Sequence, residues 1–457
     1  MKAESVSEPD AGLGRNSLFA SIVRFALPLA ASSLLQLLFN AADVIVIGQF
    51  SSANSLAAVG ADGLLTGLFA NILLNLALGS TVVASRYLGA GETDEVRAIV
   101  HVSMAFASVT GIVFMGMMYA LGKPLLLLLQ TPEEVMPAAL QYLYFYLPGL
   151  PGVALYNFGA ALLRAKGDTK RPFYFLLASG ILNVFLNLFF VLVCHMDVAG
   201  VALATTISQY VATGLLILCL MRERDAFHLN LRALHIEHHS LAGILKIGIP
   251  SAIQCILFYI SNFVIQAAIN SFGAITMAGN AAAANIEMFV GVCMSGFEQA
   301  GMTYVSRSLG AHDYRRIDRV NRISILCTAV VGELLGLVVV LFAEPLMHVY
   351  TPNKLAITQG VIRIQFICGT YGICGLMDSI GANTRGLGYA TVPSVVTMFG
   401  ACILRIVWIL SVFQMPQYHT LNCLFAAYPG SWAVTALMLA VCYIIIRKKF
   451  PKPQTAA

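Results

Sequence analysis

Two long stretches without a charged residue constrain the fold of this chain more than any other feature of its sequence. The first runs for 40 residues from Ile247 to Ile286, and the second covers Val407–Ile446. As one straight helix, the first would be about 60 Å long, roughly twice the hydrocarbon core of a bilayer. It therefore turns back on itself, and the sequence predicts the turn at 270–273. The strands of a membrane barrel alternate apolar and polar residues, which these stretches do not do.

Composition points to the same class of protein. Hydrophobic residues make up 58% of the chain and charged residues 11%, against about 25% charged residues in soluble domains. We therefore predict an all-α polytopic membrane protein with about 12 transmembrane helices. Besides the two uncharged stretches and the segment that continues to Tyr304, the predicted spans are 18–48, 55–85, 98–121, 135–163, 172–195, 198–221, 320–342, 359–384 and 390–413.

The basic residues predict the orientation of these spans. If the amino terminus is cytoplasmic, the inner segments hold 23 lysines and arginines, Lys2 and Lys452 among them, and the outer loops hold Lys123 and Lys354. Basic residues concentrate on the cytoplasmic side of membrane proteins. We therefore expect a multi-pass protein of the cell membrane with both termini in the cytoplasm. The net charge of +5 then reflects topology, and we expect no nucleic-acid partner.

An internal repeat with a spacing of about 221 residues divides the chain into two related halves. Residues 85–90 (Ser-Arg-Tyr-Leu-Gly-Ala) recur at 306–311 as Ser-Arg-Ser-Leu-Gly-Ala. Each half contains an even number of spans, so the halves are parallel repeats, an arrangement found in transporters. We predict a first six-helix lobe over 1–222, a cytoplasmic linker over 223–246 and a second six-helix lobe over 247–457. The other recurring pairs include Arg164 and Arg385, Gly167 and Gly388, and Pro172 and Pro393.

The sequence lacks the motifs of a membrane enzyme. The ten cysteines are spread through the spans without a CxxC pair, and no glycine-rich phosphate loop is present. The polar cluster 235–239 lies in the predicted linker, where adjacent polar residues are usually solvated. We therefore expect a transporter without a catalytic site, a bound metal or a cofactor.

Polar residues inside the spans of the first half predict a cation-coupling site. Asp43 lies about 9 Å from the outer end of its helix, Asn187 about 10 Å and Thr205 about 12 Å. Asn183 shares a helix face with Asn187, because the two are four residues apart. These side chains provide hard oxygen ligands for a small cation, or a polar surrounding for a carboxylate that binds a proton. The alternative is that Asp43 only joins helices through hydrogen bonds.

The second half predicts part of a substrate cleft. Glu287 and Glu298 are eleven residues apart and so share one helix face, which would look toward water or a cationic ligand; inward packing is the alternative. Glu333 and Arg405 are expected to form a structural ion pair. The residues predicted to line the cleft are Gln36, Asn40, Glu287, Glu298 and Asp378.

The pattern of polar residues, glycines and prolines in this sequence resembles that of the multidrug and toxic compound extrusion (MATE) transporters. The resemblance covers essentially the whole chain. The resemblance implies twelve spans, two lobes, and exchange of amphipathic, often cationic drugs for protons or sodium ions. It also implies that the first-lobe cation site comprises Asp43, Asn183 and Thr205. This chain departs at Asn187, where many relatives have an aspartate. The matching features are Pro28, Gln36, Asn40, Asp43 and Gly48, the repeated Leu-Gly-Ala, the turn at 164–168, and Ala204-Thr205.

We therefore expect a cation-coupled antiporter that exports amphipathic, mainly cationic small molecules and works as a monomer in the lipid bilayer. A flippase for a lipid-linked precursor is the alternative, but it would require basic residues at membrane depth in both halves, and the first half has none. The proton is favoured as the coupling ion, because Asn187 is neutral and sodium is held best by several negative oxygens. Weak sodium binding by the carboxylate, amides and hydroxyl remains the alternative.

Overall fold

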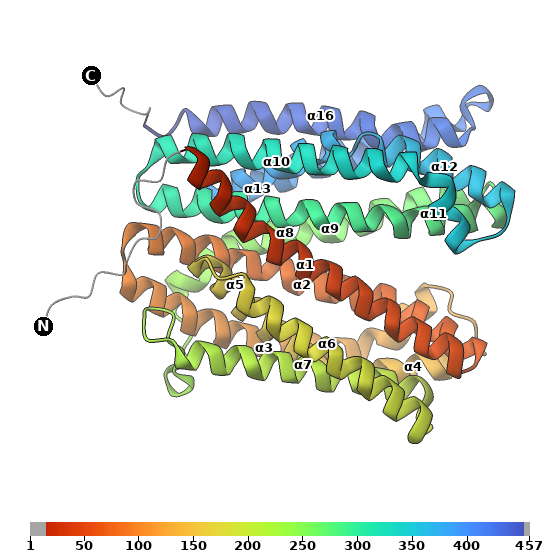
Figure 1. The fold of residues 1–457 in the computed structure, drawn as a ribbon, viewed down its shortest axis with the longest axis horizontal. Helices are drawn as coiled ribbons and strands as arrows, with labels where there is room; N and C mark the ends of the chain where they lie inside the picture. The colour runs from red at the N-terminus through yellow and green to blue at the C-terminus, as the bar shows by residue number, and fades with distance from the viewer. Residues whose placement is uncertain (1–14, 452–457) are drawn as a thin grey trace, which may run out of the picture.

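The computed structural model describes residues 15–451, a long bundle in which every regular element is helical (Figure 1). Residues 1–14 and 452–457, with the two chain termini, Lys2 and Lys452 of the topology prediction, lie outside the described residues. The all-helical fold class is confirmed for the part of the chain that the structure covers.

The first half of the described chain consists of helices that follow one another along the sequence. Their elements are α1 (Arg15–Phe50), α2 (Ala53–Ala90), α3 (Thr93–Leu128), α4 (Met136–Tyr146), η1 (Leu147–Gly149), α5 (Leu150–Lys166), α6 (Lys170–Leu188), η2 (Phe189–Val193) and α7 (Asp197–Arg222). A short 3-10 turn, η3 (Leu231–Ala233), lies between the halves.

The second half repeats this order. Its elements are α8 (His238–Asn270), α9 (Ala274–Gly310), α10 (Tyr314–Leu341), α11 (Ala343–Tyr350), α12 (Lys354–Cys368), α13 (Tyr371–Gly386), α14 (Thr391–Thr397), η4 (Met398–Ile403), α15 (Leu404–Leu410), η5 (Val412–Gln414), η6 (Pro416–Tyr418) and α16 (Leu421–Arg447). The predicted turn at 270–273 is confirmed, because α8 ends at Asn270 and α9 begins at Ala274.

The number of membrane segments in the described chain comes to ten or eleven, close to the predicted number of about 12. Ten segments of the described chain are long and apolar enough to cross a membrane, and α12 with α13, bent by 46°, makes an eleventh. In the first half, α4, η1 and α5 occupy the equivalent place in the repeat and form a similarly interrupted segment. The interruption lies at Pro148, whose ring removes a backbone donor and prevents a continuous helix.

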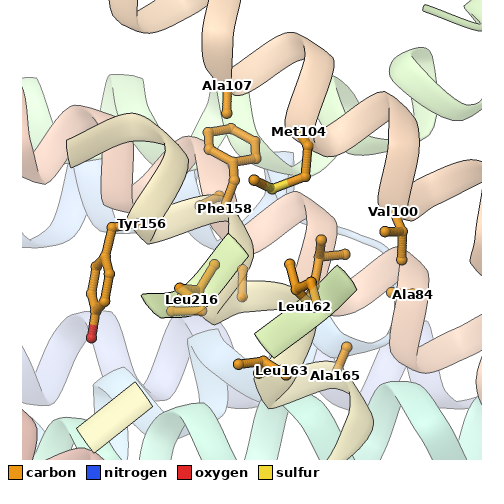
Figure 2. Packing of buried hydrophobic residues seen from close by; sticks show 14 of the residues in the cluster. Ala84, Val100, Met104, Ala107, Tyr156, Phe158, Leu162, Leu163, Ala165 and Leu216 are labelled. Atoms are coloured by element: carbon orange, nitrogen blue, oxygen red, sulfur yellow. The ribbon is translucent and has the colours of Figure 1, made fainter. Parts of the chain in front are cut away.

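The hydrophobic core of the first lobe packs around α5. Phe158 of α5 lies against Met104 and Ala107 of α3 in one buried cluster (Figure 2). Two residues of α8, Ile244 and Ala252, belong to the same cluster, although they come from the second half of the chain.

The first helix of each half therefore packs partly against the opposite lobe. Leu18, Ile22 and Phe25 of α1 are buried in a cluster with Phe297 and Ala300 of α9. The corresponding part of α8 packs along α2, which is the most extensive pairing of helices in the described chain. The two lobes are thus joined through the first helix of each half, which packs against both lobes.

Glycines allow the lobes to touch backbone to backbone at the end of the bundle where Arg86 and Arg307 lie. A Cβ atom on Gly89 would be 2.0 Å from the carbonyl oxygen of Arg307, and one on Gly310 would be 1.8 Å from that of Arg86. Nearby, the Ser306 hydroxyl donates to the carbonyl of Val82 at 2.6 Å. The recurring Leu-Gly-Ala motif therefore forms a close backbone contact between the lobes.

Candidate cation site and substrate cavity

Three helices of the first lobe bring the predicted polar residues together. Asp43 lies near the end of α1 that is distant from Arg15, and it is 8% exposed. Asn183 and Asn187 lie on the same face of α6, just before the π-helical turn η2, and both are buried. The start of α7 is held by Ser55, whose hydroxyl donates to the Asp197 carboxylate at 2.7 Å, and Thr205 follows two turns later.

The four side chains form one connected polar cluster. Asn187 Nδ2 donates to Asp43 Oδ1 at 2.5 Å and lies 3.3 Å from Asn183 Oδ1. Asn183 Nδ2 donates to Thr205 Oγ1 at 3.2 Å. The single hydroxyl hydrogen of Thr205 has two acceptors within range, Val201 O at 3.0 Å and Asp43 Oδ2 at 3.4 Å. The structure thus brings together Asp43, Asn183, Asn187 and Thr205, whose role in coupling remains a prediction.

One oxygen of the cluster has no donor. Asn187 Oδ1 is buried and has no hydrogen-bond partner among the described residues. A buried amide oxygen without a partner loses the hydrogen bond that it would make with water. The cluster thus offers the Asp43 carboxylate, the oxygens of Asn183 and Thr205, and the unpartnered oxygen of Asn187. Such a set of oxygens can accommodate a small cation or a protonated group.

A cavity of about 420 Å³ opens beside the cluster, entirely within the first lobe. Asp43, Asn183 and Thr205 belong to its wall, and so do Gln36 and Asn40, as the sequence predicts for a substrate site. Its volume lies in the range of small-molecule sites. Aromatic side chains supply much of the remaining wall: Phe39, Tyr142, Tyr146 and Tyr156.

The cavity wall also contains amides that the sequence reasoning missed. Asn71, Asn157 and Gln209 line the same space, and Asn71 Nδ2 donates to the hydroxyl of Tyr259 in α8 at 3.2 Å. Each is a neutral polar residue inside an apolar span, the same signal that identified Asn183. The signal was applied to three helices only, and so these amides were overlooked.

The acids of the second lobe lie elsewhere. Glu287 of α9 forms an ion pair with Arg363 of α12, through Nη2 and through Nε at 3.1 Å, and Arg363 Nη1 also donates to Asn280 at 2.7 Å. Because its carboxylate is paired with Arg363, Glu287 packs against a neighbouring helix and does not face water or a cationic ligand.

Glu298 and Asp378 also fall outside the first-lobe cavity. They lie on α9 and α13, close enough to interact electrostatically with each other and with Arg385. The Cys374 thiol lies 3.4 Å from the Asp378 carboxylate. The structure therefore does not bring Glu287, Glu298 and Asp378 together with Gln36 and Asn40.

The expected ion pair between Glu333 and Arg405 is wrong. Glu333 accepts the backbone N–H of Gly372 at 2.9 Å. Arg405 Nε donates to Ser431 at 2.7 Å, and its guanidinium lies 4.3 Å from the ring centre of Tyr428. The aromatic face of α16 thus stabilises the arginine by a cation–π contact, which charge counting along a sequence does not reveal.

Comparisons with known proteins agree on one family. The MatE family model matches residues 28–189 and 250–410, one segment in each half. The chain is 24% identical over 448 residues to the "Probable multidrug resistance protein YoeA" of Bacillus subtilis, with 95% of each chain covered. It is 26% identical over 417 residues to the "Probable multidrug resistance protein NorM" of Thermotoga maritima, covering 90% of this chain and 87% of that one.

A solved structure shares the fold. The Vibrio cholerae MATE transporter VcmN in its bent form superposes with a TM-score of 0.86 at 21% identity, covering 95% of this chain and 98% of that chain. The agreement over nearly the full length includes both lobes.

Proposed function

Because this chain belongs to the MATE family of membrane transporters, we propose that it exports amphipathic organic cations in exchange for protons. One observation carries the proposal. Asp43 is at once a member of the polar cluster and part of the cavity wall. A coupling cation and a cationic substrate would therefore meet at one carboxylate. Competition of two ligands for the same group provides the negative coupling that an exchanger requires.

The lining of the cavity supports an amphipathic cation as the substrate. Aromatic faces attract apolar rings and cations, and the amides of Gln36, Asn40 and Asn71 can hydrogen-bond to substituents. Within the described residues, the wall of this cavity contains no lysine or arginine. A phosphate-bearing headgroup would find no counter-charge there, and this argues against the flippase alternative. The names of the relatives, multidrug resistance proteins, favour the same class of substrate.

The neutral side chain of Asn187 supports the proton over sodium. Asp43 supplies the only formal negative charge among the four residues of the cluster, because Asn187 contributes an amide that donates to it. Sodium is held best by several oxygens that include negative ones. A proton needs only one carboxylate oxygen.

Transport into proteoliposomes tests this function. The probe is ethidium, a fluorescent organic cation, with pH and sodium gradients applied separately. We expect the pH gradient to drive ethidium movement at constant sodium. Asp43→Asn, which keeps the shape of the side chain but removes its charge, should lower this rate at least about tenfold, a loss of about 1.4 kcal/mol or more in coupling.

The matched control is Asp94→Asn, which neutralises an acid whose side chain is 93% exposed at the start of α3. It should transport like the wild type. Movement driven by a sodium gradient at constant pH, with none driven by pH alone, would show that the coupling ion has been assigned incorrectly. Normal pH-driven movement in a well-folded Asp43→Asn protein would reduce Asp43 to a structural role.

A further inference from the structure

A second carboxylate of the first lobe is buried without any partner. Asp62 of α2 is 0% exposed, and both of its carboxylate oxygens lack a hydrogen-bond partner among the described residues. Asp43 differs from it, because Asn187 and Thr205 face its carboxylate.

Burial of this kind determines which form of the carboxyl group the protein can hold. An ionised carboxylate that is removed from water and left without donors or a counter-charge is strongly destabilising, so such groups are neutralised instead. No described lysine, arginine or histidine compensates the charge of Asp62. In the conformation described here, burial therefore favours the protonated form of Asp62.

The position of Asp62 on α2 places it directly behind the cavity wall. Val59, Gly63 and Thr66, its neighbours on one side of the helix, line the cavity. Ala58 and Leu65, on its other side, belong to a buried apolar cluster with α4. A small rotation of α2, or entry of water between α2 and α4, would therefore connect the carboxyl group with the cavity.

Tyr142 is a titratable residue of α4 that lies in the region of the two acids. It belongs to the cavity wall, and it interacts electrostatically with both Asp43 and Asp62. Tyr146 stacks on it, with ring centres 6.1 Å apart.

The other helices packed against α2 present their titratable groups elsewhere. Tyr156 of α5 faces the cavity, and Tyr259 of α8 bonds to Asn71, more than two turns from Asp62 along α2. Asp197 of α7 accepts from Ser55, two turns away in the opposite direction. The polar contact of α2 with α3 joins Ser80 to Ser103, and its polar contact with α9 joins Val82 to Ser306. Both contacts lie near the carboxyl end of α2, whereas Asp62 lies near its amino end.

We propose that Asp62 is a second proton-binding residue of the transport cycle, which exchanges its proton with water in the adjacent cavity. When water reaches Asp62 from the cavity, the carboxyl proton passes to that water and Asp62 is left as a hydrated carboxylate. Asp62 takes up a proton again when it returns to its buried position. This inference rests on the proposed proton exchange and adds that about two protons, not about one, move for each substrate ion.

The first readout does not depend on transport. Infrared difference spectra of the purified protein at neutral pH, in water and in heavy water, detect the C=O stretch of a protonated carboxylic acid. We expect a band that disappears in Asp62→Asn and shifts in Asp62→Glu, while Asp94→Asn leaves it unchanged. Asp62→Glu retains the acid, so it keeps the test valid if Asp62→Asn folds poorly.

The second readout is the stoichiometry in proteoliposomes, measured from the opposing pH gradient that just stops ethidium movement. We expect about two protons per ethidium in the wild type and about one in Asp62→Asn, which should still transport. Absence of the band, or an unchanged stoichiometry in Asp62→Asn, would overturn the role of Asp62. Failure of the proposed function is recognised separately, because a pH gradient would then drive no movement even in the wild type.

Discussion

Asn187 is the residue at which the cation preference of the first-lobe cluster can be changed. Its amide contributes a donor to Asp43 and an oxygen without a partner. Asn187→Asp would replace the donor with a second carboxylate beside the first. Two adjacent carboxylates repel each other unless a cation lies between them, so sodium binding should be favoured. We expect ethidium movement to become responsive to a sodium gradient at constant pH, with apparent sodium affinity raised at least about tenfold.

Asn71→Asp provides the matched control for this change. It adds an acid to the wall of the same cavity, but at a position whose amide bonds to Tyr259 and not to Asp43. It should leave the response to sodium unchanged. Equal sodium responses in the two variants would mean that a negative charge anywhere in the cavity wall attracts sodium. The cluster around Asp43 would then not be a specific sodium site.

The residues of the first-lobe cluster could be predicted because each is a polar group at a similar depth in an otherwise apolar helix. The rise of 1.5 Å per residue was enough to match Asp43 with Asn187 and Thr205. The partners of the second-lobe acids could not be predicted in this way. Glu287 meets Arg363 because α9 packs against α12, and depth along a helix does not specify which neighbour a side chain faces.

At the scale of helices, α2 and α9 form a contact that the chain makes twice. The two contacts join Gly89 to the Arg307 backbone and Gly310 to the Arg86 backbone. Gly89→Ala or Gly310→Ala would place a Cβ atom within 2.0 Å of a carbonyl oxygen, so that the helix backbones would have to separate. We expect each substitution to destabilise this contact by about 1–3 kcal/mol and to open the lobes at this end.

Labelling of Ser306→Cys by a water-soluble maleimide measures this opening, because Ser306 bonds to Val82 across the same contact. Labelling should be faster in the Gly89→Ala background. Gly116→Ala is the control, since a Cβ atom on Gly116 would meet nothing within 4 Å. Labelling that is unaffected by Gly89→Ala would mean that this contact does not hold the lobes together.

Element boundaries could be predicted where turns are sharp, and less well where helices bend or extend. The span predicted as continuous over 135–163 is interrupted at η1, and the span at 359–384 bends by 46° after Cys368. Apolar composition records how much of a segment lies in the membrane and not whether its axis is straight. The bends occur at Pro148 and Gly369. A count of apolar residues does not show that these two residues interrupt a helix.

At the scale of the whole molecule, the distribution of basic residues predicts which end of the bundle faces the cytoplasm. In Figure 1, α1 begins and α16 ends at the same end of the bundle, and α7 also ends there, at Arg222. Reporter fusions and cysteine labelling in 223–246 should therefore place this linker in the cytoplasm, with Lys123 and Lys354 on the outside. External labelling of the linker in intact cells would refute both the orientation and the inner position of the glycine contacts.

The packing of each first helix against the opposite lobe has a consequence for how such a chain can arise. Each half leaves part of its own interior uncovered, because Ile244 and Ala252 complete one core while Leu18, Ile22 and Phe25 complete the other. A half-length chain would thus be incomplete alone, and two copies related by a two-fold axis would complete each other's cores. Fusion of two such genes would join the pair into one polypeptide. The two copies are then free to diverge, so that one can keep an acid at position 43 while the other carries Ile265.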